Sequence, residues 1–217
     1  MSSIAVVGGT GQQGRGLAQR FISAGERVII GSRDPRRARE TVATWEATAS
    51  IAVADNIGAV AEADLVVIAV PFPTVDPLLT ELRPHFRSGM IVIDVTVPVT
   101  FSAGKMTMLD VAEGSASEHI RARLPESVLL AAAFKTIPAY LLGAAGQPLD
   151  CDEFVCGDSD DARAGAARLI QMLPGVRAVD VGPLSRARHI EHLTALAIAI
   201  NRKHKIHDAR FRVIGLR

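Results

Sequence analysis

The chain has 217 residues, which is enough to bury a sizeable core in one large domain or in one domain with a small appendage. Its formal net charge of +1 carries no nucleic-acid signature. Hydrophobic residues make up 48% of the chain, but only one Trp, one Tyr and seven Phe are aromatic. This profile fits Val- and Ile-rich strands packed between Ala- and Leu-rich helices, and it argues against a secreted β-sandwich.

Targeting and membrane signals are missing from the sequence pattern. No apolar run reaches the roughly 20 residues that a membrane-spanning helix needs. The N-terminal apolar stretch is too short for a secretory signal peptide. Cys151 and Cys156 match neither a zinc motif nor a disulfide framework. We therefore expect reduced thiols, a cytoplasmic protein, and no membrane or nucleic-acid partner.

The N-terminus carries a glycine-rich turn. The apolar run from Ile4 to Val7 leads into the pattern Gly9-x-Gly11-x-x-Gly14, and a helical pattern follows. In such a turn the first glycine permits the tight bend, the second lets the backbone approach a pyrophosphate, and the third lets helix and strand pack closely. The N–H groups at the start of the helix would face the phosphates. A turn of this kind can also bind nothing, but the strand and helix around it favour a dinucleotide site.

The end of the next expected strand, at residues 27–30, indicates which dinucleotide binds. Sites for NAD place a carboxylate there, whereas this chain has Ser32 and Arg33. A hydroxyl donor and a planar guanidinium suit a 2′-phosphate, and Arg36 or Arg37 could add a second cation. Asp34 is the competing detail that would favour NAD. The alternative is a solvated basic loop, and we expect NADP.

The remaining pattern alternates strands and helices. Further strands are expected at 51–53, 65–70, 90–95, 128–133, 154–156, 176–181 and 210–214, although the alanines of 128–133 leave a helix possible there. Helices are expected at 14–24, from Pro35 past Trp45, briefly after Asp55 or Asn56, and at 74–86, 115–124, 160–173 and 185–203. The alternation predicts an α/β fold of Rossmann type, with a doubly wound, mostly parallel sheet.

Three expected loops follow the carboxyl ends of buried strands, where ligands bind in open sheets of this type. They are 71–73, 96–98 and 134–139, and each contains proline, which stiffens a loop. Any one of them could be an ordinary turn. Together at one sheet edge, rigid apolar loops suit a site that holds two flat rings face to face.

Motifs along nearly the whole chain, in order, point to a known family. They are Gly8 to Ala18, Gly31-Ser32-Arg33, Asp94 to Pro98, Thr136 to Ala139, Val155 to Asp158, Val181 to Leu184, Glu191 to Thr194 and Asn201 to Lys203. In these stretches the chain resembles the NADPH-dependent reductases of the deazaflavin coenzyme F420, the 8-hydroxy-5-deazaflavin:NADP oxidoreductases. The late motifs are more diagnostic than the glycine-rich turn.

The resemblance implies reversible hydride transfer between NADP(H) and F420. It also implies an NADP-binding Rossmann domain at 1–140 and a smaller C-terminal domain at 141–217 that completes the cleft. The residues that it assigns to cofactor binding are Gly9, Thr10, Gly11, Gln12, Gln13 and Gly14 around the pyrophosphate, Ser32, Arg33 and Arg37 at the 2′-phosphate, Val70 and Pro71 beside the nicotinamide, and Ile137 and Ala139 where the two rings meet.

Two positions depart from the family pattern. Phe72 stands where some relatives have tryptophan, and Lys135 stands where relatives tend to have His or Asn. If its ammonium points into the cleft, Lys135 could stabilise negative charge on the deazaflavin and act as the catalytic residue. The alternative is an exposed lysine at a loop edge without a role. Lys135 could also mark a member with a different hydride acceptor.

Hydride transfer between two ring carbons requires no nucleophile or metal, only stacking at about 3 to 3.5 Å with aligned orbitals. Two other functions remain open: NADP-dependent reduction of a small carbonyl or imine compound, and a non-catalytic NADPH-sensing module.

The last expected helix is apolar on nearly every face from Leu193 to Ile200, so it should be buried, either inside the monomer or in a homodimer, which we expect. The basic stretch after Pro183 fits a solvated helix and tail, or a segment that attracts an anionic substrate.

Overall fold

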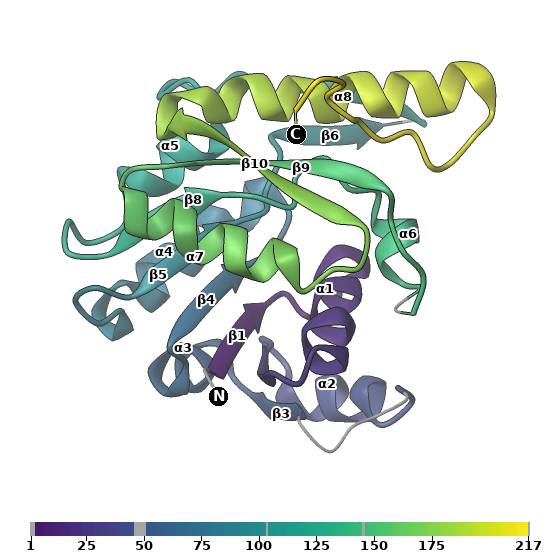
Figure 1. Cartoon of the computed structure of the whole chain (residues 1–217). Coiled ribbons are helices and arrows are strands. Elements are labelled where there is room, and N and C mark those ends of the chain that lie inside the picture. Colours follow the sequence, from purple (N-terminus) through teal and green to yellow (C-terminus); the bar gives the residue numbers. More distant parts are fainter. Residues whose placement is uncertain (1–2, 46–50, 103, 145, 217) are drawn as a thin grey trace.

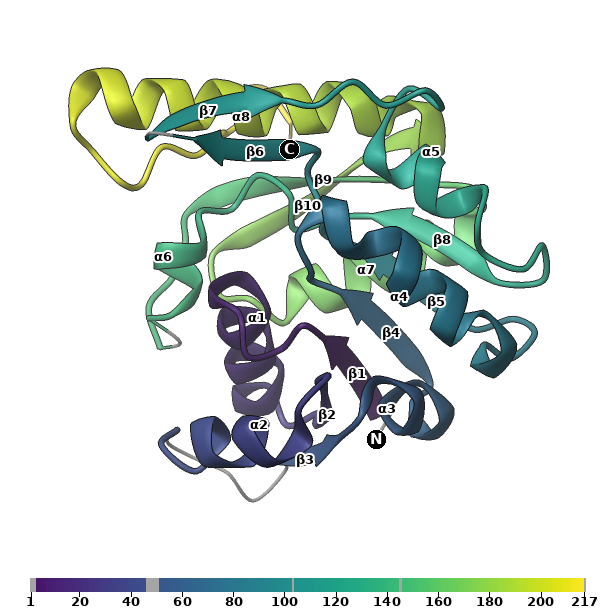
Figure 2. The ribbon, with the colours of Figure 1, turned by 180° about the vertical axis from the view of Figure 1, so that it is seen from behind.

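The computed structural model describes residues 3–45, 51–102, 104–144 and 146–216. One eight-stranded sheet runs through the molecule in the order β10-β9-β8-β5-β4-β1-β2-β3, with helices on both faces (Figures 1 and 2). Its neighbouring strands pair in parallel except β8 and β9, which are antiparallel. The predicted doubly wound, mostly parallel Rossmann-type sheet is therefore confirmed.

The strands of the sheet are β1 (Ser3–Val7), β2 (Arg27–Gly31), β3 (Ile51–Ala54), β4 (Leu65–Ile68), β5 (Ile91–Asp94), β8 (Leu129–Ala132), β9 (Cys151–Gly157) and β10 (Val176–Pro183). The α-helices are α1 (Gln12–Ser23), α2 (Pro35–Val42), α3 (Asn56–Glu62), α4 (Val75–Leu82), α5 (Ala116–Arg121), α6 (Ala139–Leu142), α7 (Asp160–Gln171) and α8 (Ala187–His204). Short 3-10 helices lie at Phe72–Thr74, Arg83–His85 and Leu184–Arg186.

The sheet is buried on both faces because its strands are apolar without alternation. In β1, Ile4 and Val6 pack with Leu17 of α1 on one face, in a cluster that also takes in α7. Ala5 and Val7 point to the other face and join the residues of α3 and α4. Successive side chains of a strand alternate between faces, so one short strand supplies both cores.

Two segments differ from the sequence-based expectation. The terminal strand expected at 210–214 is absent from the described structure. The Phe211 carbonyl accepts the Asp152 N–H of β9 at 2.8 Å, but side chains bind the backbone of Val213. The Asp152 carboxylate accepts the Val213 N–H at 2.6 Å, and the Arg177 guanidinium donates to the Val213 carbonyl at 2.8 Å. In addition, α2 ends at Val42 rather than past Trp45, where the chain turns back tightly through a Trp45 N–H bond to the Val42 carbonyl.

A β-hairpin that the sequence analysis did not anticipate follows β5. Its strands, β6 (Val99–Ser102) and β7 (Lys105–Met108), form a separate two-stranded antiparallel sheet that runs beside α8 in Figure 2. Each strand is only four residues long and largely exposed, so the apolar pattern that reveals buried strands is missing.

A buried arginine ties α1 to the start of the C-terminal part. Arg20 is 1% exposed, and its guanidinium donates hydrogen bonds of 2.8–3.2 Å to four backbone carbonyls, those of Leu141, Leu142, Ala144 and Gln147. The division into domains at residue 140 remains a prediction. It would fall between β8 and β9, which pair within the same sheet.

Candidate active site

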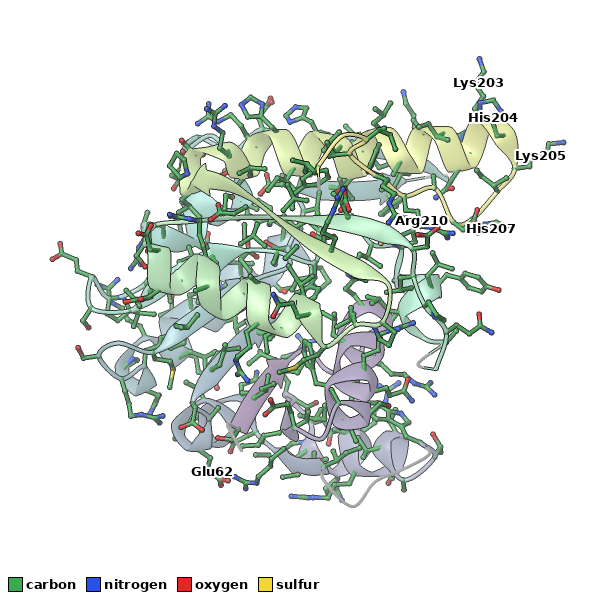
Figure 3. The ribbon with its side chains drawn as sticks, in the orientation of Figure 1. Glu62, Lys203, His204, Lys205, His207 and Arg210 are labelled. Atoms are coloured by element: carbon green, nitrogen blue, oxygen red, sulfur yellow. The ribbon has the colours of Figure 1, made fainter. Side chains whose placement is uncertain are left out.

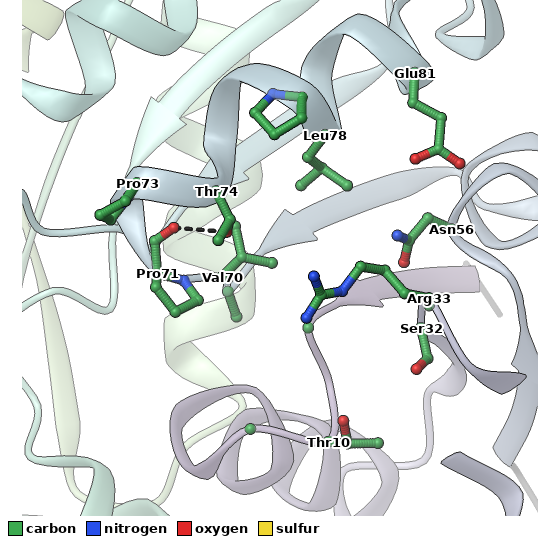
Figure 4. A pocket seen from close by; sticks show the side chains of 15 residues that line it. Thr10, Ser32, Arg33, Asn56, Val70, Pro71, Pro73, Thr74, Leu78 and Glu81 are labelled. Atoms are coloured by element: carbon green, nitrogen blue, oxygen red, sulfur yellow. Dashed lines mark hydrogen bonds between the residues drawn. The ribbon is translucent and has the colours of Figure 1, made fainter. Parts of the chain in front are cut away.

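The carboxyl ends of β1, β2, β4, β5 and β8 open onto adjoining hollows. We call the first the nucleotide groove, whose lining includes Thr10, Ser32, Arg33, Arg37, Asn56 and Leu78 (Figure 4). We call the second the ring cleft, whose lining includes Phe72, Val97, Ile137, Ala139, Tyr140 and Ile198. Gly11, Val70 and Pro71 line both, so the two hollows form one path across the sheet edge.

The glycine-rich turn is as tight as the sequence predicts. Gly8 has φ +82°, and a Cβ at that position would lie 2.5 Å from the Ala69 carbonyl oxygen. A Cβ on Gly14 would lie 2.5 Å from the Gly8 carbonyl oxygen, and one on Gly9 would lie 2.8 Å from Ile30. Gly9 and Gly14 are buried and do not line either hollow. Their role is close packing, and a bound phosphate would meet the residues around them.

The start of α1 faces these hollows. The first helical hydrogen bond joins the Arg15 N–H to the Gly11 carbonyl at 2.7 Å, which leaves the N–H groups of Gln12 and Gln13 without a partner inside the helix. Gly11 caps the helix without a side chain, and Thr10 lies beside it. Backbone N–H groups at a helix N-terminus attract anions, so this turn fits the pyrophosphate of a dinucleotide.

The loop after β2 brings Ser32, Arg33 and Arg37 together at one end of the nucleotide groove. Within the described residues, neither Arg33 nor Arg37 forms an ion pair with a carboxylate of the chain. Asp34, the residue that would favour NAD, caps α2 and accepts the Arg37 N–H at 3.1 Å. Two guanidinium groups without a carboxylate partner fit the 2′-phosphate of NADP.

Asn56 adds a signal that the sequence analysis missed. It lies in the wall of the nucleotide groove and is 4% exposed, yet its Oδ1 has no hydrogen-bond partner in the part of the chain that the structure describes. Asp55 caps α3 instead, by accepting the Gly58 N–H at 2.6 Å. A buried acceptor without a partner costs about 1 to 3 kcal/mol, and a hydroxyl or amine donor of a bound nucleotide would satisfy it. No sequence pattern distinguishes Asn56 from an ordinary capping residue.

The three proline-containing loops meet at the ring cleft, as the sequence predicts. Pro71 and Phe72 come from the loop after β4, Val97 from the loop after β5, and Ile137 from the loop after β8. Helix α8 adds Ile198. Val70 and Pro71 lie where the groove meets the cleft, and Ile137 and Ala139 line the cleft itself, which is lined largely by apolar side chains.

Lys135 lines the ring cleft but is not an exposed lysine at a loop edge, and its catalytic role stays a prediction. Its side chain is 0% exposed, so the exposed loop-edge lysine is wrong. Its ammonium donates to Asp94 Oδ2 at 2.7 Å, to Glu191 Oε1 at 3.3 Å and to the Thr96 carbonyl. Burial lowers the pKa of Lys135, but the carboxylates of Asp94 and Glu191 outweigh it and raise the pKa above its ordinary value. The ammonium is therefore held by two carboxylates and one carbonyl of the protein itself.

The loop after β8 is also fixed by the buried carboxylate of Glu153. Glu153 of β9 accepts the Lys135 N–H at 3.0 Å and the Thr136 hydroxyl at 2.7 Å. Burial raises the pKa of Glu153 to about 7, although these hydrogen bonds oppose the shift. Phe134 has φ +58°, and its carbonyl accepts the Gln13 side-chain amide at 2.8 Å. Gln13 therefore links the glycine-rich turn to the ring cleft.

Comparisons with known proteins agree with this geometry. Residues 3–98 match the family described as NADP oxidoreductase coenzyme F420-dependent. The F420-dependent NADP reductase of Methanothermobacter thermautotrophicus is 40% identical over 98% of this chain and 95% of its own. The chain belongs to the F420-dependent NADP reductase family. Another F420-dependent NADP reductase, from Methanothermobacter marburgensis, is 38% identical over 98% of both chains.

A solved structure extends the similarity to F420-dependent NADP reductases from sequence to fold. A candidate member from Arthrobacter sp. fb24 superposes with a TM-score of 0.86 at 27% identity, over 98% of this chain and 99% of its own. In this member of the reductase family, no helix among the described residues is long and apolar enough to cross a membrane. The described part also holds no cluster of three or more His, Cys, Asp or Glu side chains that could bind a metal ion.

The basic C-terminal stretch of this F420-dependent NADP reductase family member lies beside the ring cleft. Lys203, His204 and Lys205 project from the end of α8 into solvent (Figure 3). Asn201 and His207, by contrast, line the cleft. Solvated residues and cleft residues therefore alternate within one short segment.

Proposed function

We propose that the protein transfers a hydride reversibly between NADP(H) and the deazaflavin coenzyme F420. The observation that carries the proposal is the continuity of the two hollows. A groove with helix N–H groups and two arginines, which have no carboxylate partner among the described residues, runs past Val70 and Pro71 into a rigid, apolar cleft. Two relatives that are 38% and 40% identical to this chain are F420-dependent NADP reductases, which supports the same pair of substrates.

In this proposal each part of the chain binds or orients a group. The N–H groups from Thr10 to Gln13 hold the pyrophosphate, and Ser32, Arg33 and Arg37 hold the 2′-phosphate. When both substrates are bound, the nicotinamide and the deazaflavin supply the redox chemistry. Val70 and Pro71 border the nicotinamide, and Ile137 and Ala139 line the place where the two rings meet. The rigid loops hold this arrangement, which lowers the entropic cost of aligning two rings.

Mixing the purified protein with NADPH and oxidised F420 tests the function. We expect the NADPH absorbance to fall when F420 is added and to return when reduced F420 is supplied with NADP. Calorimetry with NADP and with NAD provides a separate measurement, in which NADP should bind more tightly. A protein that binds neither NADP nor NADPH would contradict the proposal, and so would one that binds NADPH but leaves it unoxidised in the presence of F420.

We further infer that the protein is a cytoplasmic homodimer that uses α8 as part of its interface. Leu196 is 50% exposed, and Ala199 on the same helix is exposed as well. A helix that is apolar on so many faces is stable in water when another surface covers it. Sedimentation at low concentration should show a dimer, and Leu196→Glu should shift it toward monomer. A monomer at all concentrations would contradict the dimer without affecting the hydride transfer. The free, buried thiols of Cys151 and Cys156 support the cytoplasmic location.

A further inference from the structure

Lys135 connects three walls of the ring cleft. Its ammonium contacts Asp94 at the end of β5, the Thr96 carbonyl in the loop after β5, and Glu191 in α8. Its own carbonyl accepts the Thr194 hydroxyl of α8 at 2.8 Å. Thr96, Lys135 and Thr194 all line the ring cleft. One residue thus joins two of the loops and the helix that enclose it.

The partners of Lys135 are themselves fixed, so the network has little freedom to move. Asp94 Oδ1 accepts both the N–H and the hydroxyl of Thr96 at 2.7 Å, and Oδ2 accepts the Ser117 hydroxyl of α5 at 2.6 Å. Glu191 Oε2 accepts the Ala116 N–H, also from α5, at 3.1 Å. A buried polar network in which the members are satisfied makes its surroundings rigid.

We propose that Lys135 is a positioning residue for the second substrate: it sets the spacing between the loop after β5, the loop after β8 and helix α8, and thereby the width of the ring cleft. It acts through Thr96 and Thr194 and touches no reacting atom itself. The proposal rests on the proposed function for the identity of the second substrate, the deazaflavin ring, and assigns to that substrate a residue outside the nucleotide groove.

Electrostatics make the ammonium necessary for this geometry. Asp94 and Glu191 are two buried carboxylates that share one cation, and their side chains are 0% and 2% exposed. Without the ammonium, two like charges would face each other in a medium where repulsion is poorly screened. The walls would then separate or admit water. The nucleotide groove has no part in this network, so its affinity for NADPH should not change.

The variant Lys135→Met tests the proposal because it replaces the lysine with an unbranched side chain one heavy atom shorter and removes the charge. We expect kcat with F420 to fall by about 10- to 100-fold and the KM for F420 to rise several-fold, while the Kd for NADPH stays within about twofold. Hydrogen exchange should accelerate in the segments 95–98 and 134–139. Glu191→Gln, which removes one carboxylate and leaves Asp94 to hold the ammonium, should lower kcat by only about threefold and serves if Lys135→Met does not fold.

Arg177→Met is the matched control. The Arg177 guanidinium binds the buried Asp152 carboxylate at 2.7 Å, between β10 and β9, and neither residue lines the cleft. This variant should lose stability but keep kcat and both substrate affinities. The proposal is overturned if Lys135→Met, like Arg177→Met, loses stability but keeps kcat and both substrate affinities. It is also overturned if Lys135→Met weakens the binding of NADPH as much as that of F420. If the wild type fails to reduce F420, the proposed function fails, and hydrogen exchange still decides whether Lys135 holds the walls.

Discussion

The nucleotide groove and the ring cleft are built in opposite ways. The groove takes most of its binding groups from one continuous segment, residues 8–37, and offers solvent-facing cations and backbone N–H groups. The cleft is assembled from five segments that lie far apart in the sequence, and buried charges hold three of them together. The contrast teaches that a phosphate can be held by local backbone geometry, whereas two flat rings require walls whose separation is fixed by long-range contacts.

The largest effect is expected from Gly8→Ala, which disrupts the local backbone geometry of the nucleotide groove. The new Cβ would lie 2.5 Å from the Ala69 carbonyl, at a backbone with φ +82°. Strain and overpacking should together lower the free energy of unfolding by about 4 kcal/mol, measured by urea denaturation, and should abolish NADPH binding.

The matched control for this prediction is Gly25→Ala. Gly25 also has positive φ, +90°, but no atom lies within 4 Å of the new Cβ. It should cost only about 1 kcal/mol and leave NADPH binding unchanged. Equal losses in the two variants would show that backbone strain alone, and not the close approach to β4, makes the turn sensitive.

A change of pH should act on the ring cleft and spare the groove. Burial raises the pKa of Glu153 from 4.5 to about 7, so between these values the folded protein binds more protons than the unfolded chain. Its contribution therefore makes the free energy of unfolding fall as the pH rises from 4.5 to 7, by roughly 3 kcal/mol. The free energy of unfolding of the wild type minus that of Glu153→Gln, measured by urea unfolding across this pH range, should show that decrease. A flat difference would contradict the raised pKa.

The 2′-phosphate end offers a smaller effect. Arg33→Ala should weaken NADPH binding about 10- to 100-fold, because it removes a charge-assisted contact worth roughly 1.5–3 kcal/mol. It should leave the affinity for NADH unchanged. Titration with both nucleotides measures the ratio. Arg36→Ala is the control, since Arg36 lies outside the groove's lining. If Arg33→Ala lowered the affinities for NADPH and NADH by comparable factors, the assignment of Arg33 to the 2′-phosphate would be contradicted.

The smallest expected effect concerns the mouth of the ring cleft. Phe101 of the β6–β7 hairpin lines the cleft and is 63% exposed, which is unusual for a large aromatic side chain without a ligand. Phe101→Ala should raise the KM for F420 about threefold to tenfold, the loss of one aromatic contact, with no change in melting temperature or in NADPH affinity. Ile214→Ala, another exposed apolar residue but outside the cleft, should change neither constant.

The local half of the site could be predicted from the sequence, for physical reasons. The glycine spacing, the strand before it and Ser32-Arg33 after β2 are all encoded within a few residues of each other, and the apolar runs identify strands buried on both faces. The proline-containing loops could be placed at one edge because parallel strands end together. The family resemblance then supplied the substrates.

The other half depends on contacts that no short pattern contains. Lys135 meets Asp94 and Glu191 across 41 and 56 residues, so its burial cannot be read from its neighbours in the chain. The unpartnered Asn56 oxygen and the carboxylate of Glu153 are equally invisible. The predicted terminal strand was wrong: the segment shares one backbone bond with β9, from the Asp152 N–H to the Phe211 carbonyl, and the side chains of Asp152 and Arg177 bind the Val213 backbone.

Arg20 carries a consequence for how the polypeptide is made. Its guanidinium binds carbonyls that lie 121 to 127 positions later in the chain and are therefore synthesised long after it. While the ribosome is still adding those residues, the first helix bears a cation that has no acceptors inside the protein and must stay in contact with water. The cofactor-binding half should therefore acquire its final shape late in synthesis, and a nascent chain stopped at residue 140 should remain open to proteases that cannot attack the finished molecule.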